Sequence, residues 1–146
     1  MASRRRPSLR ALAELVVVAS LCAACEPTFK PEGGSITIDG AAFRPTACHV
    51  LAGTTGGIAL SDAAGVRLEL TLPPTRLDAF QEVHATSRVR YQVPGKPAVD
   101  LGACGELVLR GEGYHAQSKR AASGWMTLSC SGTATVKGDL TFAGCF

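Results

Sequence analysis

Apolar residues in this chain recur at every second position rather than at helical spacing. The clearest run covers residues 66–72, where a valine and three leucines alternate with arginine, glutamate and threonine. Side chains of a strand point alternately to its two faces, so this run predicts a strand with one buried and one solvated face. The same alternation occurs at residues 36–38, 49–51, 58–61, 88–93, 106–110, 126–129 and 140–142.

Seven or eight short antiparallel strands without a long helix predict an all-β chain, folded as a small antiparallel β-sandwich or barrel. The turn composition of residues 62–65 predicts a hairpin that places Leu60 opposite Val66. A three-residue loop at 136–138 predicts a second hairpin near the end of the chain. Residues 75–83 follow two prolines and are expected to form either a short helix or an irregular crossover.

The first 25 residues have the composition of an export signal. Four arginines precede an uncharged, mostly apolar run of ten residues at 15–24. A transmembrane helix needs roughly 20 apolar residues, so this run predicts a secretory signal peptide instead. Its end, Ala23 and Ala24 before Cys25, resembles the lipobox of bacterial lipoproteins, with Cys22 where that family usually has leucine.

This resemblance implies a signal peptide over residues 1–24 and a lipidated Cys25, carrying diacylglycerol and palmitate-type chains, as the mature N-terminus. Residues 25–33 contain two prolines and no periodicity, which predicts a short tether, and residues 34–146 are expected to form a single β domain. Glu26 follows the cysteine. By analogy with sorting in enteric bacteria, this predicts a lipid anchor in the outer membrane, with the domain on the periplasmic face. Ordinary signal cleavage without a lipid is the alternative.

Charge gives no support for a nucleic-acid partner. The full chain has 15 Lys and Arg against 12 Asp and Glu. Removing residues 1–24 takes away four arginines and one glutamate, which leaves 11 of each sign. A nucleic-acid-binding domain needs a basic surface, so this protein is not expected to bind nucleic acid.

Cysteine counting favours the lipid interpretation. Lipidating Cys25 leaves an even set of four in the mature chain, whereas cleavage without a lipid leaves five. An exported domain with four cysteines is expected to form two disulfides. The set is Cys48, Cys104, Cys130 and Cys145. These four cysteines and the three histidines of the chain show no C-x-x-C or H-x-x-x-H spacing, so no metal or other cofactor is expected.

Strand alternation indicates which cysteines share a face. It places Cys130 inward with Leu128, and Cys104 and Cys145 outward. That arrangement favours Cys104–Cys145 with Cys48–Cys130. The other pairing considered, Cys130–Cys145 with Cys48–Cys104, needs a bulge that Gly132 or Gly144 could supply. Both pairings stay open at this point.

The longest polar stretch between predicted strands covers residues 113–123. It carries Tyr114, His115, Lys119 and Arg120, a combination able to bind an anionic sugar or phosphate. A solvated hairpin loop is the simpler interpretation. Trp125, the only tryptophan, is expected to pack in the core, with stacking on a ligand as the alternative.

No catalytic motif of the G-x-S-x-G, H-E-x-x-H or phosphate-loop type occurs in the chain. The sequence therefore predicts a non-enzymatic cell-envelope lipoprotein. It would be bound to the membrane through its lipid and would act as a periplasm-facing interaction or structural module, contacting an envelope protein or glycan. The alternatives are a small-ligand or glycan binder that uses the 113–123 loop, and an inhibitor of an envelope hydrolase.

Overall fold

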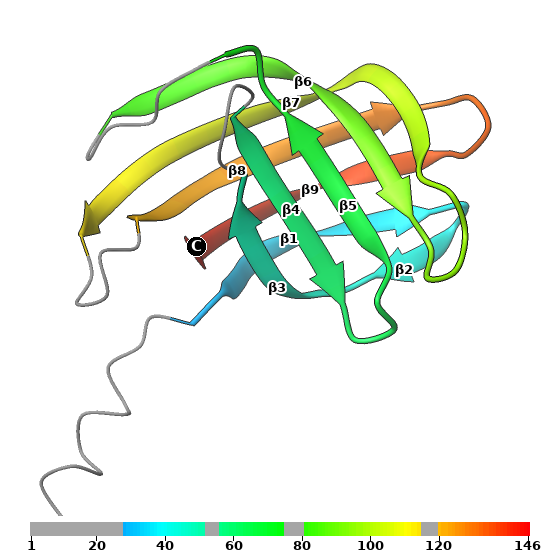
Figure 1. Ribbon diagram of the computed structural model, residues 1–146, viewed down its shortest axis with the longest axis horizontal. Helices are drawn as coiled ribbons and strands as arrows, with labels where there is room; N and C mark the ends of the chain where they lie inside the picture. Colours follow the sequence, from blue (N-terminus) through cyan, green and yellow to red (C-terminus); the bar gives the residue numbers. More distant parts are fainter. Residues whose placement is uncertain (1–27, 52–55, 75–80, 115–119) are drawn as a thin grey trace, which may run out of the picture.

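Every regular element in the described part of the chain is a β-strand (Figure 1). The computed structural model describes residues 28–51, 56–74, 81–114 and 120–146. The strands are β1 (Lys30–Ile38), β2 (Ala41–Phe43), β3 (Pro45–Val50), β4 (Gly57–Asp62), β5 (Arg67–Thr71), β6 (Glu82–Gln92), β7 (Val99–Tyr114), β8 (Arg120–Cys130) and β9 (Val136–Cys145). The predicted all-β class is confirmed. Of the possible helix at 75–83, residues 75–80 lie outside the described residues and Val83 belongs to β6.

The nine strands form one antiparallel sheet in the order β2-β1-β9-β8-β7-β6-β5-β4-β3. β2 and β3 are separated only by Arg44, so the two ends of this order are halves of one bent segment. The first half pairs with β1 and the second with β4. The sheet therefore curls into a nearly closed barrel, in which every strand pairs with its neighbours in sequence except β2 with β3, and β9 returns to β1 (Figure 1).

The barrel closes along a seam, defined here as the contact between β3 and the end of β9. The amide of Val50 donates to the carbonyl of Phe146 at 2.8 Å, and the amide of Phe146 donates to the carbonyl of Cys48 at 3.3 Å. A disulfide joins Cys48 to Cys145 across the same seam. The hydrogen bonds satisfy edge groups that would otherwise be open to another strand, and the disulfide holds the two edges together.

Large apolar side chains occupy the interior of the barrel. Counting β2 and β3 as one bent strand gives eight, and a barrel of that size is just wide enough to be filled by side chains. The largest fully buried side chains are Phe142, Ile36, Ile58, Leu60, Leu68, Leu70, Leu107, Leu109, Met126, Val89, Val136 and Cys130. All but Val136 and Cys130 are inward-facing members of the alternating runs, so sequence periodicity accounts for most of the core.

The chain forms two disulfides, as predicted, but neither of the two pairings considered from the sequence is correct. The bridges are Cys48–Cys145 and Cys104–Cys130. The face assignment failed for Cys104 and Cys145 because it assumed unbroken alternation, and a β-bulge interrupts the strand beside each of them.

The bulge in β7 leaves Cys104 between two paired residues: Ser87 faces Gly105, and Arg88 faces Ala103. This turns Cys104 toward the core and Cys130. In β9, Ala122 faces Cys145 and Gly124 faces Phe142, which leaves one extra residue on β9. The extra residue rotates Cys145 inward, where it is fully buried beside Cys48.

Both predicted hairpins have the wrong register. Leu60 pairs with Leu68 rather than Val66, because Asp62 Oδ1 accepts bonds from the amides of Ala64 and Val66 and stabilises a longer loop. This two-residue shift keeps the same side chains on the inner face. Near the end of the chain the turn is at 131–135, not 136–138.

Candidate functional site

The residues predicted for a ligand-binding loop are only partly described. Tyr114 and Arg120 face each other at the ends of β7 and β8. Their side chains lie outside the described residues, as do His115 and Lys119. Residues 1–27, with the predicted signal peptide and Cys25, lie outside them as well. Among the described residues, the candidate binding groups are exposed side chains on the outer face of the barrel.

Trp125 lies on the outer face of β8, so the expectation that it packs in the core is wrong. Its side chain is 39% exposed, and it is the one large hydrophobic side chain exposed among the described residues. Strand pairing aligns it in one row with His84 on β6, Val108 on β7 and Thr141 on β9. These four residues are called the Trp125 patch below.

Two aromatic rings cover Val108 in the Trp125 patch. Trp125 and His84 are separated by strand β7, and two strand spacings amount to about 9.6 Å. Their ring centroids are nevertheless only 5.9 Å apart, with the planes tilted by 58°. The rings must therefore lean toward each other above Val108. This explains why Val108 faces outward but is only 6% exposed.

The sequence contains the signal that places Trp125 outside. Met126 and Leu128 are inward-facing in the predicted strand, so Trp125 shares the opposite face with Thr127. The expectation of a buried Trp125 followed the usual burial of tryptophan rather than this alternation of faces along the strand. The result is an indole on an outer wall, with the exposed Thr127 and Thr141 close by.

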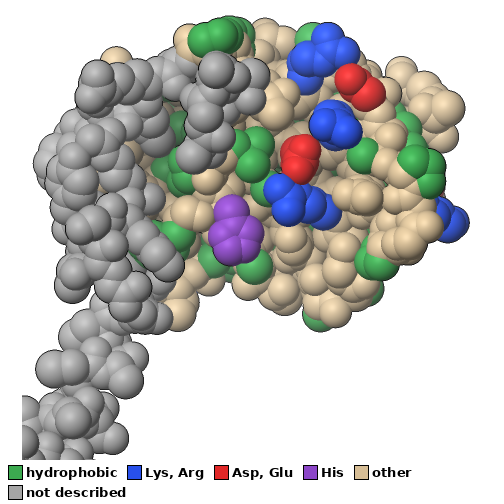
Figure 2. Space-filling model, in the orientation of Figure 1, with side chains coloured by type: hydrophobic (Ala, Val, Ile, Leu, Met, Phe, Trp, Pro, Cys, Tyr) green, Lys and Arg blue, Asp and Glu red, His purple; other side chains and the backbone are tan. Residues whose placement is uncertain are grey.

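A second feature is a set of charged side chains on β5, β6 and β7, called the arginine face below. Its members are Arg67, Glu69, Arg88, Arg90 and Asp100. Figure 2 shows basic and acidic side chains alternating across the front of the molecule. With three arginines against two carboxylates, these groups carry one net positive charge.

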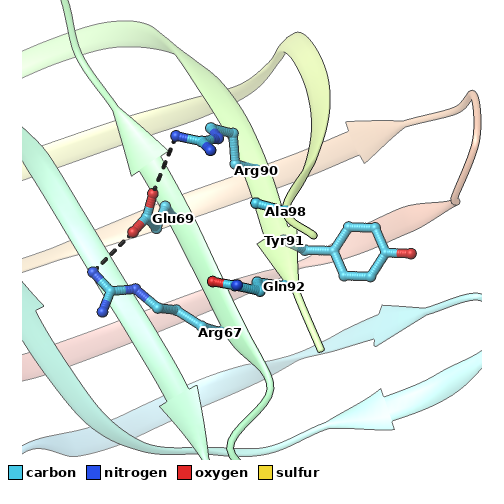
Figure 3. A pocket seen from close by; sticks show the side chains of 6 residues that line it. All are labelled: Arg67, Glu69, Arg90, Tyr91, Gln92 and Ala98. Carbon is cyan, nitrogen blue, oxygen red and sulfur yellow. Dashed lines mark ion pairs between the residues drawn. The ribbon is translucent and has the colours of Figure 1, made fainter. Parts of the chain in front are cut away.

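Glu69 is the centre of this arginine face. Its Oε1 atom lies 2.8 Å from Arg67 Nη2, and its Oε2 atom lies 4.0 Å from Arg90 Nη1. Figure 3 shows the two guanidinium groups approaching Glu69 from either side. Because the arginine side chains are 43% and 48% exposed, these ion pairs contribute little to stability and the guanidinium groups remain available to a partner.

Asp100 is held ionised by its neighbours. Its carboxylate accepts a bond of 2.8 Å from the amide of Gly102 and one of 3.0 Å from Arg88 Nη2. The amide bond from Gly102, followed by Arg88, lowers the pKa of Asp100 below the ordinary value of 3.8. The Gly102 amide is free to do this because it lies beside a second bulge of β7, between the pairs Val89–Gly102 and Arg90–Asp100, where Gly102 has a φ of +81°.

A shallow hollow opens on the arginine face beside Glu69 (Figure 3). It measures about 90 Å³ and is lined by Arg67, Glu69, Arg90, Tyr91, Gln92 and Ala98. Sites for small organic ligands usually measure about 300–1,000 Å³, so this hollow is too small for one.

Within the described ranges, no three His, Cys, Asp or Glu side chains are grouped so that they could hold a metal ion. None of the described residues belongs to a helix able to cross a bilayer. No family model, curated protein or solved structure matches the chain.

Proposed function

We propose that this protein is a lipid-anchored module of the bacterial cell envelope that acts by contact through its outer surface, without catalysis. The observation that carries the proposal is that the exposed tryptophan and arginine side chains lie on the outer surface of the barrel. Large apolar groups occupy the barrel interior, whereas the Trp125 patch and the arginine face lie on the outside. Arginine and tryptophan are enriched where proteins meet partners.

The disulfides support export to an oxidising compartment. All four cysteines among the described residues are paired in disulfides, and such bridges persist outside the cytosol. Cys25 then remains for the thioether-linked lipid that the lipobox-like segment predicts. Two or more acyl chains give stable anchoring where a single chain does not. Outer-membrane attachment facing the periplasm is part of this proposal.

Labelling with a palmitate analogue tests the anchor. In cells that express the full chain, the native protein should incorporate the label, and Cys25→Ala should abolish it. Cys22→Ala is the matched control, because it removes a neighbouring thiol of the same segment and should leave labelling intact. Labelling that survives Cys25→Ala, or is absent from the native protein, would refute the anchor.

Photo-crosslinking in intact envelopes tests the contact function. A photo-reactive amino acid at Arg90 should yield a discrete adduct with an envelope protein, because Arg90 is exposed on the arginine face. The same amino acid at Ser35, exposed on β1, is the control and should yield none. Adducts that are absent at both positions, or equal at both, would count against a specific contact at this face.

Glycan binding is a second candidate, favoured by the exposure of Trp125. An indole can stack on a sugar ring, and the exposed hydroxyl groups of Thr127 and Thr141 lie close by. Titration with soluble cell-wall glycan fragments should then change the emission of the single tryptophan. An emission spectrum that stays constant up to millimolar glycan would remove this candidate.

A further inference from the structure

We infer that the barrel rests on the bilayer through the wall that carries Trp125, with the indole at the level of the lipid headgroups. This inference rests on the proposed lipid anchor at Cys25. It assigns the two outer features different partners: phospholipid for the Trp125 patch, and the envelope contact for the arginine face.

The last four residues of the predicted tether, 30–33, belong to β1. β1 begins at Lys30, which pairs with Ala143, and the ring of Phe29 packs 6.5 Å from that of Phe142. The backbone of Thr28 already lies against Gly144, so closely that a Cβ at Gly144 would collide with the Thr28 carbonyl. Only three Cα–Cα steps separate Cys25 from Thr28, which limits the span to about 11 Å.

Trp125 lies near the point where this tether meets the barrel. β8, which carries Trp125, is the direct neighbour of β9, against which Thr28 and Phe29 pack. The pair Ala122–Cys145 marks the same end of the barrel. Trp125 is three residues along β8 from Ala122, a distance of about 10 Å. An anchor within about 11 Å of Thr28 therefore keeps this wall close to the bilayer surface.

The chemistry of the wall suits a headgroup interface. Tryptophan prefers this depth because its ring is apolar and its N–H group is polar. On the anchor side of Trp125, Arg110 on β7 pairs with Glu82 on β6, so these two described charges offset each other.

Two acidic residues limit how deep the wall can sit. Glu106 and Asp139 lie one row farther from the anchor than Trp125, on β7 and β9. Both are exposed, and moving their carboxylates into hydrocarbon would be costly. The indole can therefore enter the headgroup region while this row stays in water.

The arginine face points the other way. In the closed order of eight strands, β9 is opposite β5 and β8 is opposite β4, and Figure 1 shows β4 and β5 in front of β8 and β9. A barrel that rests on β8 and β9 thus exposes Arg67, Glu69 and Arg90 to the periplasm. Lipid contact and protein contact need not compete for the same surface.

Fluorescence of the single tryptophan tests this orientation directly. The lipidated full-length protein is reconstituted into phosphatidylcholine vesicles, with and without bromine on the upper acyl chains. We expect emission at shorter wavelength than in detergent-free buffer, and quenching by the brominated lipid. The matched variant combines Trp125→Phe with Thr71→Trp, which moves the indole to the outer side of β5, where Thr71 pairs with Arg88. Its emission should not be quenched.

The outcomes separate the orientation from the anchor. Protein that floats with the vesicles but shows an unquenched Trp125 overturns the orientation and leaves the anchor standing. Equal quenching at positions 125 and 71 also overturns it, because the barrel would then have no preferred wall. A response of Trp125 to soluble glycan fragments but not to vesicles makes glycan the occupant instead. Protein that does not float refutes the anchor, and the orientation with it.

Discussion

Removing the seam disulfide should destabilise the protein more than removing the other bridge. Cys48–Cys145 closes a loop of 97 residues, whereas Cys104–Cys130 closes one of 26. In the chain-entropy model, loops of these lengths correspond to about 4.7 and about 3.5 kcal/mol of stabilisation. The expected difference between the two double variants is thus about 1.2 kcal/mol. Against a total of about 5–15 kcal/mol, loss of either bridge is a large change.

The comparison uses the variants Cys48→Ala/Cys145→Ala and Cys104→Ala/Cys130→Ala. Each removes two sulfur atoms from a buried or partly buried position, so the loss of packing is similar and the difference reports mainly on loop closure. The assay is urea unfolding of residues 26–146, exported behind a cleavable signal without a lipobox. Midpoint and slope together give the free energy of unfolding.

Hydrogen exchange locates the effect. The amides of Val50 and Phe146 bond across the seam, so their protection should fall selectively in the Cys48→Ala/Cys145→Ala variant. In the Cys104→Ala/Cys130→Ala variant they should stay protected relative to the rest of the sheet. If the second variant proves the less stable, or if seam protection is equal in both, the reasoning that the long-range bridge closes the barrel is wrong.

Three further substitutions test particular contacts. The Ser87 hydroxyl is buried without a hydrogen-bond partner among the described residues, so Ser87→Ala should raise the free energy of urea unfolding by about 1 kcal/mol; a decrease would reveal a partner. Gly144 has a φ of +68° and abuts the Thr28 carbonyl, so Gly144→Ala should cost about 1–2 kcal/mol and speed proteolysis near Thr28; unchanged cleavage would contradict this packing. The lowered pKa of Asp100 stabilises the fold above its ordinary value of 3.8, and this stabilisation is lost as pH falls through the lower folded-state pKa. Asp100→Asn should therefore lower Tm near neutral pH, with a difference from the native protein that shrinks in acid; a constant difference would exclude this linkage.

The candidate surfaces were only partly predictable. The alternation around Met126 predicts that Trp125 faces outward. The contact between the rings of Trp125 and His84 is not predictable in this way, because it joins two strands that are about 40 residues apart in the chain. The arginine face likewise joins Arg67 and Glu69 to Arg90, and Arg88 to Asp100, through the registers of three strands. The spacing of residues along one strand does not determine how that strand is aligned with its neighbours.

Local patterning by itself determined the strand class and most inward-facing residues. Those properties follow from the two-residue period of a strand, which acts over a few neighbours. Tertiary structure alone decided the closure of β3 on β9, the registers and the cysteine partners. The bulges beside Cys104 and Cys145 reverse side-chain parity, and such bulges arise where paired strands of unequal residue count must fit one closed sheet. That constraint belongs to the whole barrel, so no single segment encodes it.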